Sequence, residues 1–233
     1  MIRMLCDRHF GIGADGLMFL EKATSVDFRM RYYNSDGREG SLCGNGGRCI
    51  AYHALLCNMV SQQNITFEAI DGTHEANVIA HDHSKAIVRL KMNDVKETKI
   101  IDGNYFIDTG SPHYLIFSDD IDKTDVFNEG RRIRNNRSLF PNGTNVNFIG
   151  IKNGQIYMRT YERGVENETL SCGTGVTAVA LAIGLQDNKT SGNQVIKTKG
   201  GELTVSWNKE GDLFYNIWLE GPAEFVFEGS IEI

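Results

Sequence analysis

Short hydrophobic runs follow one another along most of the chain, separated by turns that contain Gly, Asn and Asp. Runs of this kind with bulky, β-branched or aromatic side chains predict strands. We expect strands at 17–20, 26–33, 64–70, 75–80, 85–92 and 104–108. Because strands outnumber helices, the pattern favours an α+β fold.

Two segments have the periodicity of helices instead. The first lies at 46–58 and the second at 173–186. Apolar residues recur on one face of each: Ile50, Ala51, Ala54 and Leu55 in the first, and Val176, Val179, Ala180 and Ile183 in the second. The pattern therefore predicts a curved sheet wrapped on one helix in each half of the chain.

The two halves repeat each other. The phrase Cys-Gly-x-Gly opens both predicted helices, and Cys43 and Cys172 are 172 − 43 = 129 residues apart. Downstream, extended runs end at Gly72 and Gly201, and 201 − 72 = 129. A repeat of this length suits two related domains that face each other.

This repeat sets the expected domains. We predict an N-terminal half at 1–109, a C-terminal half at 110–222, and a terminal segment at 223–233 that returns to the N-terminal half. The expected fold is thus two pseudo-symmetric domains, each a curved and mostly antiparallel sheet or barrel around a central helix. Domains of about 110 residues are a common size.

Composition excludes several classes of function. The net charge of −6 argues against nucleic acid as the main partner, which would require a basic stripe. The longest apolar stretch, 176–185, is too short to span a membrane, and no signal peptide is visible at Met1. We therefore expect a cytoplasmic protein without nucleic-acid or membrane partners. A small zwitterionic substrate and a homodimer are both compatible with these numbers.

The five cysteines are an odd number and include no CxxC pair, so we expect reduced thiols without a disulfide framework or zinc site. A buried, hydrophobic role is expected for Cys6, Cys49 and Cys57. Gly11-Ile12-Gly13-Ala14-Asp15-Gly16 is formally GxGxxG, but it precedes a strand, which argues against dinucleotide binding. The segment 81–83, His-Asp-His, lacks a third metal ligand and indicates a polar loop.

Cys43 and Cys172 carry different chemistry, because a thiol at the start of a helix lies beside unpaired N–H groups and the positive end of the helix dipole. The same N–H groups can hold a carboxylate, and the following glycines let a ligand approach the backbone. Two such helix starts facing each other could remove a proton from one face of a carbon and return one to the other, which inverts a stereocentre.

At this point the chain resembles a known family. Asn34-Ser35-Asp36-Gly37 followed by Cys43-Gly44-Asn45-Gly46-Gly47-Arg48 resembles the signature of the diaminopimelate epimerases. Tyr161-Glu162-Arg163-Gly164 before Cys172-Gly173-Thr174-Gly175 resembles their second cysteine motif. The resemblance covers nearly the whole chain. It implies a cofactor-independent enzyme that converts LL- to meso-diaminopimelate on the route to lysine and peptidoglycan.

The resemblance also implies roles for individual residues. Cys43 and Cys172 would be the acid–base pair, and Gly44, Asn45, Gly173 and Thr174 would hold the carboxylate at the reacting carbon, although Asn45 or Thr174 could also cap a helix. The distal end of the substrate would be bound by Asn34, Ser111, Asn145, Glu162 and Arg163. His113 would tune the pKa of the thiols together with Glu162. A turn at Asn34, a surface ion pair of Glu162 with Arg163, and a structurally satisfied His113 stay open as alternatives.

The sequence departs from the family in two places. Ser111 replaces the asparagine of a Gly-Asn-Pro-His phrase. The family's opening strand, with its His-Gly-x-Gly-Asn-Asp-Phe phrase, has no match here, and the repeat partner of Gly110 would lie at 110 − 129 = −19. We therefore expect about twenty residues to lie upstream of Met1 or to be lost. A truncated, non-catalytic amino-acid-binding paralogue and a racemase of another small amino or imino acid are the alternative interpretations.

Overall fold

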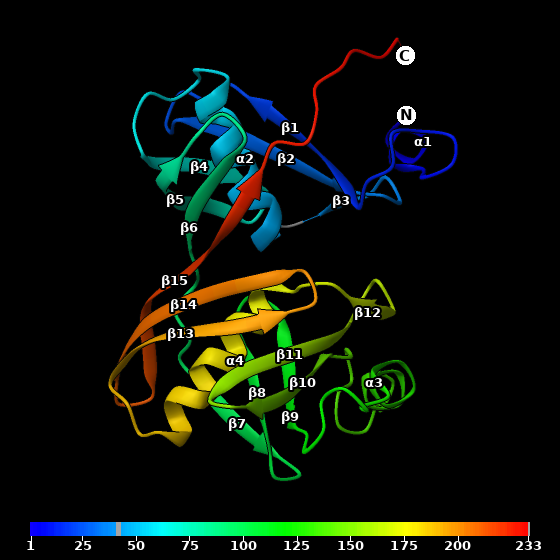
Figure 1. Cartoon of the computed structure of the whole chain (residues 1–233), viewed down its shortest axis with the longest axis vertical. Coiled ribbons are helices and arrows are strands. Elements are labelled where there is room, and N and C mark those ends of the chain that lie inside the picture. Colours follow the sequence, from blue (N-terminus) through cyan, green and yellow to red (C-terminus); the bar gives the residue numbers. More distant parts are fainter. Residues whose placement is uncertain (41–42, 233) are drawn as a thin grey trace. The chain divides into compact units, whose positions relative to one another are not determined.

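The computed structural model describes residues 1–40 and 43–232 (Figure 1). Two compact units can be distinguished: Met1–Leu90 with Gly221–Ile233, and Lys91–Glu220. The sequence repeat put the boundary near residue 109, whereas the units divide after Leu90. The reason is that residues 98–108 form a hairpin whose second strand pairs with the following strand, Pro112–Phe117, of the second unit.

The first unit contains one long helix and a mostly antiparallel sheet. Its elements are α1 (Ile2–Cys6), β1 (Gly16–Glu21), β2 (Phe28–Asn34), β3 (Glu39–Gly40), α2 (Gly44–Leu56), β4 (Asn64–Ala69), β5 (Gly72–His81) and β6 (Lys85–Lys91). The strand order is β1-β2-β4-β5-β6, with β3 beside β2. Only β2 and β4 run parallel among the pairs described here. A parallel pair requires a crossover, and α2 supplies it while packing against β1, β2 and β5.

The core of this unit lies between α2 and the sheet. Ile65, Phe67 and Ala69 alternate inward along β4, as a half-buried strand requires. Phe67 stacks on Phe28 of the neighbouring strand with ring centroids 5.1 Å apart. The predicted helix is found, but it begins at Gly44, directly after Cys43.

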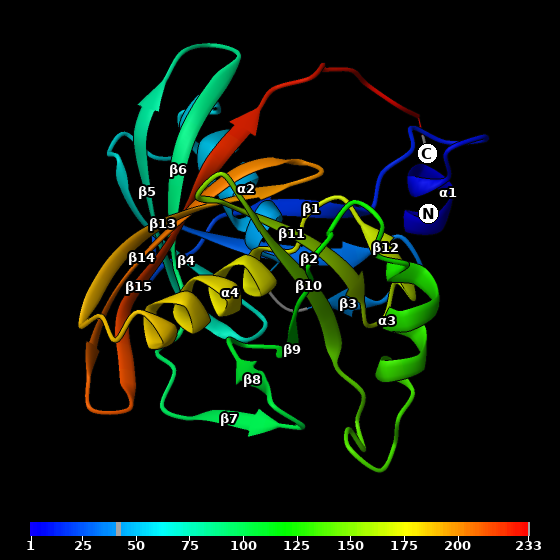
Figure 2. The ribbon, with the colours of Figure 1, turned by 60° about the horizontal axis from the view of Figure 1, so that its bottom comes forward.

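The second unit repeats this design with more strands. Its elements are β7 (Thr98–Ile101), β8 (Asn104–Asp108), β9 (Pro112–Phe117), α3 (Val126–Arg134), β10 (Asn145–Lys152), β11 (Gln155–Glu162), β12 (Asn167–Thr169), α4 (Gly173–Gln186), β13 (Ser191–Thr198), β14 (Gly201–Glu210) and β15 (Leu213–Glu224). The strand order is β15-β14-β13-β11-β10-β9-β8-β7, with β12 beside β11. Figure 2 shows α4, in yellow, running along the strands of this unit. It is buried over most of its length, as expected for a helix that is apolar all round.

The repeat is visible in the topology of the two units. In the first, β2 pairs in parallel with β4 across α2; in the second, β11 pairs in parallel with β13 across α4. The hairpins that follow turn at Gly72 and Gly201, with φ of +126° and +127°, values that L side chains rarely adopt. The predicted α+β fold of two pseudo-symmetric domains, each with a central helix, is confirmed.

Helix α3 was not predicted. Asp125 caps it by accepting the backbone N–H of Asn128 at 3.1 Å. The helix packs against β10 and β11, where Val126 joins a cluster with Val146, Phe148 and Tyr161. The helix is short and mostly polar, and only Val126, Phe127 and Ile133 mark its apolar face, so the sequence offered few hydrophobic positions from which to predict it.

Candidate active site

Cys43 and Cys172 occupy equivalent positions, because each is the N-cap residue of the central helix of its unit. Both have extended backbone conformations, and their carbonyls accept the first helical hydrogen bonds, from Gly47 at 2.7 Å and Val176 at 2.9 Å. Cys43 is half-buried and Cys172 is buried. Unpaired N–H groups of a first helical turn therefore follow each sulfur.

The first turn of α2 is fixed by a buried arginine. Arg48 donates to the carbonyl of Gly44 at 3.1 Å and to Oδ1 of Asn45 at 2.9 Å. Burial lowers the pKa of Arg48, while Cys49 and Cys43 oppose this shift. Asn45 is thus held inside the first turn and does not cap the helix. Arg48 is part of the first cysteine motif, but the sequence alone did not predict a role for it, because its burial depends on the tertiary fold.

In the first turn of α4, Thr174 has several partners. Its carbonyl accepts from the hydroxyl of Thr109 at 2.8 Å. Its hydroxyl lies 2.9 Å from Nε2 of His113 and 3.5 Å from Sγ of Cys172. His113 is fully buried on β9, and desolvation lowers its pKa to about 3, with a further lowering by the charge of Arg163. This histidine is therefore neutral near pH 7.

A second group of predicted site residues gathers where β10 and β11 meet. Asn145 donates to Oγ of Ser111 at 2.9 Å, and its Oδ1 accepts the backbone N–H of Arg163 at 2.8 Å. Glu162 accepts from the hydroxyl of Thr169 at 2.9 Å. Ser111 thus takes part in a hydrogen-bonded contact despite replacing the expected asparagine.

Asn34 ends β2 of the first unit, as Glu162 ends β11 of the second. Its backbone accepts from Gly37 at 2.8 Å and donates to Arg38 at 2.9 Å, so it opens a turn. The turn expected as the alternative for Asn34 is therefore present, and its side chain is exposed. Of the predicted residues, Asn34, Cys43, Gly44 and Asn45 belong to the first unit and the others to the second.

Several expectations about other residues can be compared with the structure. Cys6 is buried, but Cys49 and Cys57 are exposed, so the buried role expected for these two is wrong. Cys57 is the C-cap residue of α2, where the chain leaves the core. His81 ends β5, and Asp82 and His83 lie in the polar turn that follows, where Asp82 accepts the backbone N–H of Ser84 at 2.7 Å. Gly11–Gly16 leads directly into β1.

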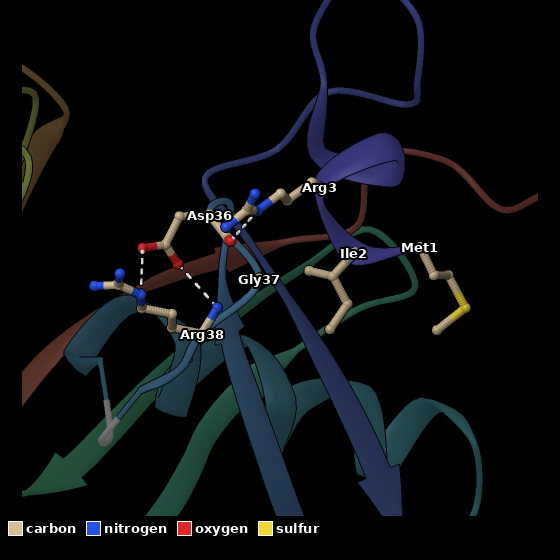
Figure 3. A pocket seen from close by; sticks show the side chains of 6 residues that line it. All are labelled: Met1, Ile2, Arg3, Asp36, Gly37 and Arg38. Atoms are coloured by element: carbon tan, nitrogen blue, oxygen red, sulfur yellow. Dashed lines mark hydrogen bonds and ion pairs between the residues drawn. The ribbon is translucent and has the colours of Figure 1, made fainter.

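Figure 3 shows a pocket beside α1, lined by Met1, Ile2, Arg3, Asp36, Gly37 and Arg38. Asp36 pairs with Arg38 at 3.8 Å and accepts from the guanidinium of Arg3 through its carbonyl. None of the residues predicted for the site lines this pocket.

Two negative findings concern the described part of the chain. Across residues 1–40 and 43–232, no three His, Cys, Asp or Glu side chains cluster closely enough to hold a metal ion. Within the same ranges, no helix has the length and apolar character needed to cross a membrane.

The fold is shared with solved structures of low sequence identity. A PhzF-family phenazine biosynthesis protein from Bacillus anthracis superimposes with a TM-score of 0.77 at 16% identity, covering 94% of this chain and 86% of that one. A hydroxyproline epimerase from Agrobacterium vitis, solved with trans-4-hydroxy-L-proline bound, gives a TM-score of 0.68 at 16% identity, covering 97% of this chain and 78% of that one. At this identity the likeness concerns the fold alone.

Sequence relatives define the class and then the family. Both the matching family model and the curated names of these relatives assign the chain to the isomerases of the epimerase type. The family model for diaminopimelate epimerase matches residues 1–97 and 105–226. The diaminopimelate epimerase of Flavobacterium psychrophilum is 49% identical over 99% of this chain and 89% of its own length, and that of Chlorobaculum tepidum is 43% identical over 100% and 91%. The chain therefore belongs to the diaminopimelate epimerase family.

Proposed function

We propose that this protein converts LL-2,6-diaminopimelate to meso-diaminopimelate by a two-cysteine acid–base mechanism. The observation that carries the proposal is the placement of Cys43 and Cys172 as the N-cap residues of two equivalent helices. Relatives named diaminopimelate epimerase across 99% of the chain support the choice of substrate. The product would serve lysine and peptidoglycan precursor biosynthesis.

In the proposed reaction, the two cysteines act on opposite faces of the α-carbon. The thiolate of Cys172 takes the α-proton of the LL form, and the electron pair of the broken C–H bond passes to the carbon and its carboxylate. The thiol of Cys43 then donates a proton to the opposite face. One proton is removed and one is added, so the reaction balances without a redox cofactor.

The helix starts would stabilise the charge that develops on the carboxylate. The backbone N–H groups after Cys43 belong to Gly44 and Asn45, and those after Cys172 belong to Gly173 and Thr174. Oriented N–H groups at a helix start bind an anion without reorganising during the reaction. Arg48 supports this role in α2 because it fixes Gly44 and Asn45.

The other end of the substrate would be bound by a second group. Arg163 is proposed to bind the distal carboxylate through its guanidinium and Glu162 the ammonium, with Asn34, Ser111 and Asn145 completing the hydrogen bonds. The contact of Asn145 with both Ser111 and the backbone of Arg163 supports this assignment. A distal carboxylate would distinguish diaminopimelate from monocarboxylic amino acids.

Solvent deuterium exchange tests this function directly. In D₂O we expect the parent protein to incorporate deuterium at the α-carbon of diaminopimelate, and Cys43→Ser and Cys172→Ser each to lose about 10²-fold or more in turnover. Cys57→Ser, which changes an exposed thiol at the end of α2, is the matched control and should behave like the parent.

Near-parental turnover in either N-cap variant would refute the two-base mechanism. Absence of exchange in the parent, with diaminopimelate still bound, would favour a non-catalytic binding protein. Exchange into proline but not diaminopimelate would instead assign the racemase alternative.

A further inference from the structure

A line of buried polar side chains crosses the sheet of the second unit and ends at the start of α4. His113 on β9, Asn147 on β10 and Thr160 on β11 are 0%, 0% and 1% exposed. Burying such groups without hydrogen-bond partners is unfavourable, so each is expected to be satisfied. The hydrogen bonds along this line have only one consistent direction.

The amide of Asn147 sets that direction. Its Oδ1 accepts the hydroxyl of Thr160 at 2.9 Å, while Nδ2 lies 3.5 Å from the carbonyl of Tyr114 and 3.0 Å from Nδ1 of His113. A carbonyl can only accept, so the nitrogen of the amide must face Tyr114. The remaining N–H therefore points at Nδ1 of His113, which must accept.

This contact fixes the tautomer of His113. Burial lowers the pKa of His113 to about 3, so the ring is neutral and holds a single hydrogen. Because Nδ1 accepts from Asn147, that hydrogen is on Nε2, which donates to Oγ1 of Thr174 at 2.9 Å. The hydroxyl of Thr174 keeps its own hydrogen while its oxygen accepts from His113, and we assign that hydrogen to the contact with Sγ of Cys172, 3.5 Å away.

The helix is held close to this line by a glycine. A Cβ at Gly175 would lie 2.6 Å from Oδ1 of Asn147 and 3.3 Å from Cε1 of His113. Only glycine lets the first turn of α4 approach Asn147 and His113 at this distance. The contact between Thr174 and His113 therefore depends on the residue that follows Thr174.

We propose that Thr160, Asn147 and His113 are positioning residues that hold the Thr174 hydroxyl as a fixed donor to Cys172. The inference rests on the proposed function. It adds that His113, while uncharged, favours the thiolate form of Cys172 through the hydrogen bonds that it makes. A hydrogen bond donated to the sulfur stabilises its charged form more than its protonated form. His113 thus acts through its orientation, with no change in its own charge.

Other charged groups on the surrounding elements must be kept constant in any test. Glu162 ends β11 and Arg163 follows it, Asp108 ends β8, and Lys197 of β13 pairs with Glu202 of β14 at 3.1 Å. On β12, Glu168 pairs with Arg159 at 2.7 Å and Lys199 at 2.8 Å. Substitutions at Thr174 and Asn147 leave all of these charged groups unchanged. A difference from the parent in the titration of Cys172 can therefore be assigned to the hydrogen bonds from Thr160 to Thr174.

The test is the pH dependence of alkylation of Cys172 by iodoacetamide, followed by mass spectrometry of its peptide in substrate-free protein. Thr174→Val and Asn147→Leu should each raise the midpoint of the curve by about one pH unit, since each removes the donor or its orientation. Thr174→Ser keeps the hydroxyl and should restore the parental midpoint. The acid limb of kcat/KM should move in the same way.

Thr177→Val is the matched control, because Thr177 is also buried in α4 but donates to the carbonyl of Gly173 at 3.0 Å. Its midpoint should equal that of the parent. If the alkylation curve of Thr174→Val coincides with that of the control, the proposal is wrong. It is also wrong if the midpoint shifts in Thr174→Val but not in Asn147→Leu. If Asn147→Leu does not fold, Thr160→Val removes only the bond to Oδ1 and tests the same orientation. Alkylation needs no turnover, so this result is separate from the fate of the proposed reaction.

Discussion

Arg163 is the single side chain on which the proposed preference for a dicarboxylic substrate mainly rests. Its backbone N–H donates to Asn145 at 2.8 Å, while its guanidinium donates to the carbonyl of Asn142 at the longer distance of 3.4 Å. A well-anchored backbone with a weakly engaged guanidinium suits an arginine that binds a ligand carboxylate.

We predict that Arg163→Lys lowers kcat/KM for diaminopimelate by well over about tenfold, because lysine keeps the charge but loses the bidentate geometry. Lysine, which lacks a second carboxylate, should be a poor substrate for the parent and lose comparatively little in the variant. Arg137→Lys, at an exposed arginine that donates to the carbonyl of Pro141 at 2.7 Å, is the control. Equal losses for both substrates would show that Arg163 does not bind the distal end.

The buried, neutral state of His113 makes a prediction about stability. Its pKa is lowered to about 3, so above the unfolded value near 6.5 neither state binds a proton there, and the full stability is present. As the pH falls from about 6.5 toward 3, the unfolded chain gains a proton that the folded protein cannot accept. Stability is therefore lost on acidification, by about 2 kcal/mol at about pH 5.

Urea unfolding at about pH 7.5 and pH 5 measures this loss in the parent and in His113→Gln, whose amide does not titrate. We expect the loss to be smaller in the variant by about 2 kcal/mol, the contribution of His113 itself. The same pH dependence in both proteins would mean that His113 becomes protonated in the folded state.

At the scale of elements, α3 shows how a close contact can reverse an intrinsic preference. Replacing a helical glycine by alanine normally stabilises a helix by about 0.5–1 kcal/mol. A Cβ at Gly130, however, would lie 2.3 Å from Cβ of Tyr161, an atom fixed to the backbone of β11.

We therefore predict that Gly130→Ala destabilises the protein by about 1–3 kcal/mol, because α3 must move away from β11. The midpoint of thermal unfolding, compared with that of Arg132→Ala on the exposed side of the same helix, measures this effect. A higher midpoint in Gly130→Ala would show that helix propensity outweighs the packing.

The sequence predicted those elements whose pattern is local. The helix at 173–186 begins at Gly173 as expected, because an apolar periodicity follows a glycine-rich turn. Asn147 was different: it lies between Val146 and Phe148, and this alternation is typical of a strand with its polar residue exposed. It is buried because β10 is covered on both sides, by α3 over Val146 and Phe148 and by Gly175 of α4 over Asn147.

The line from Thr160 to Cys172 could not be predicted for a related reason. Asn147 lies opposite Thr160 in the antiparallel register of β10 and β11. In the parallel pairing of β9 and β10 its partner is Leu115, so His113, two residues away on β9, lies diagonally on the same face as Asn147. A shift of one residue in either register would turn these side chains to the opposite face. Register between distant strands is a property of tertiary packing.

For the whole molecule, the proposed reaction makes a prediction about oxidation. If both sulfurs act on one carbon, little movement should bring them into disulfide geometry, with Cα atoms about 5.5–6 Å apart. Mild oxidation should then inactivate the protein by joining Cys43 to Cys172, and dithiothreitol should restore activity. Mass spectrometry of the oxidised protein identifies the pair. A link between Cys43 and Cys49 instead would contradict the idea that both helix starts serve one site.

Strand β15 begins in the second unit and ends in the first, and this path leads us to predict the order in which the two units fold. The second unit is one continuous stretch, and its two ends are joined by a hydrogen bond from the backbone N–H of Met92 to the carbonyl of Ile217 at 2.9 Å. The first unit includes the residues from Gly221 onward, and among these the carbonyl of Pro222 accepts a hydrogen bond from Nε of Arg48 at 3.4 Å. Once the second unit is folded, it holds its two ends together and so shortens the effective loop between Arg48 and Pro222. The conformational entropy lost when these two residues come into contact is then smaller.

We therefore predict that the N-terminal half, although it is translated first, completes its fold last. In pulse-labelling hydrogen exchange during refolding, amides of α4 should gain protection before those of α2. Simultaneous protection of both helices would mean that the second unit does not fold before the contact between Arg48 and Pro222 forms.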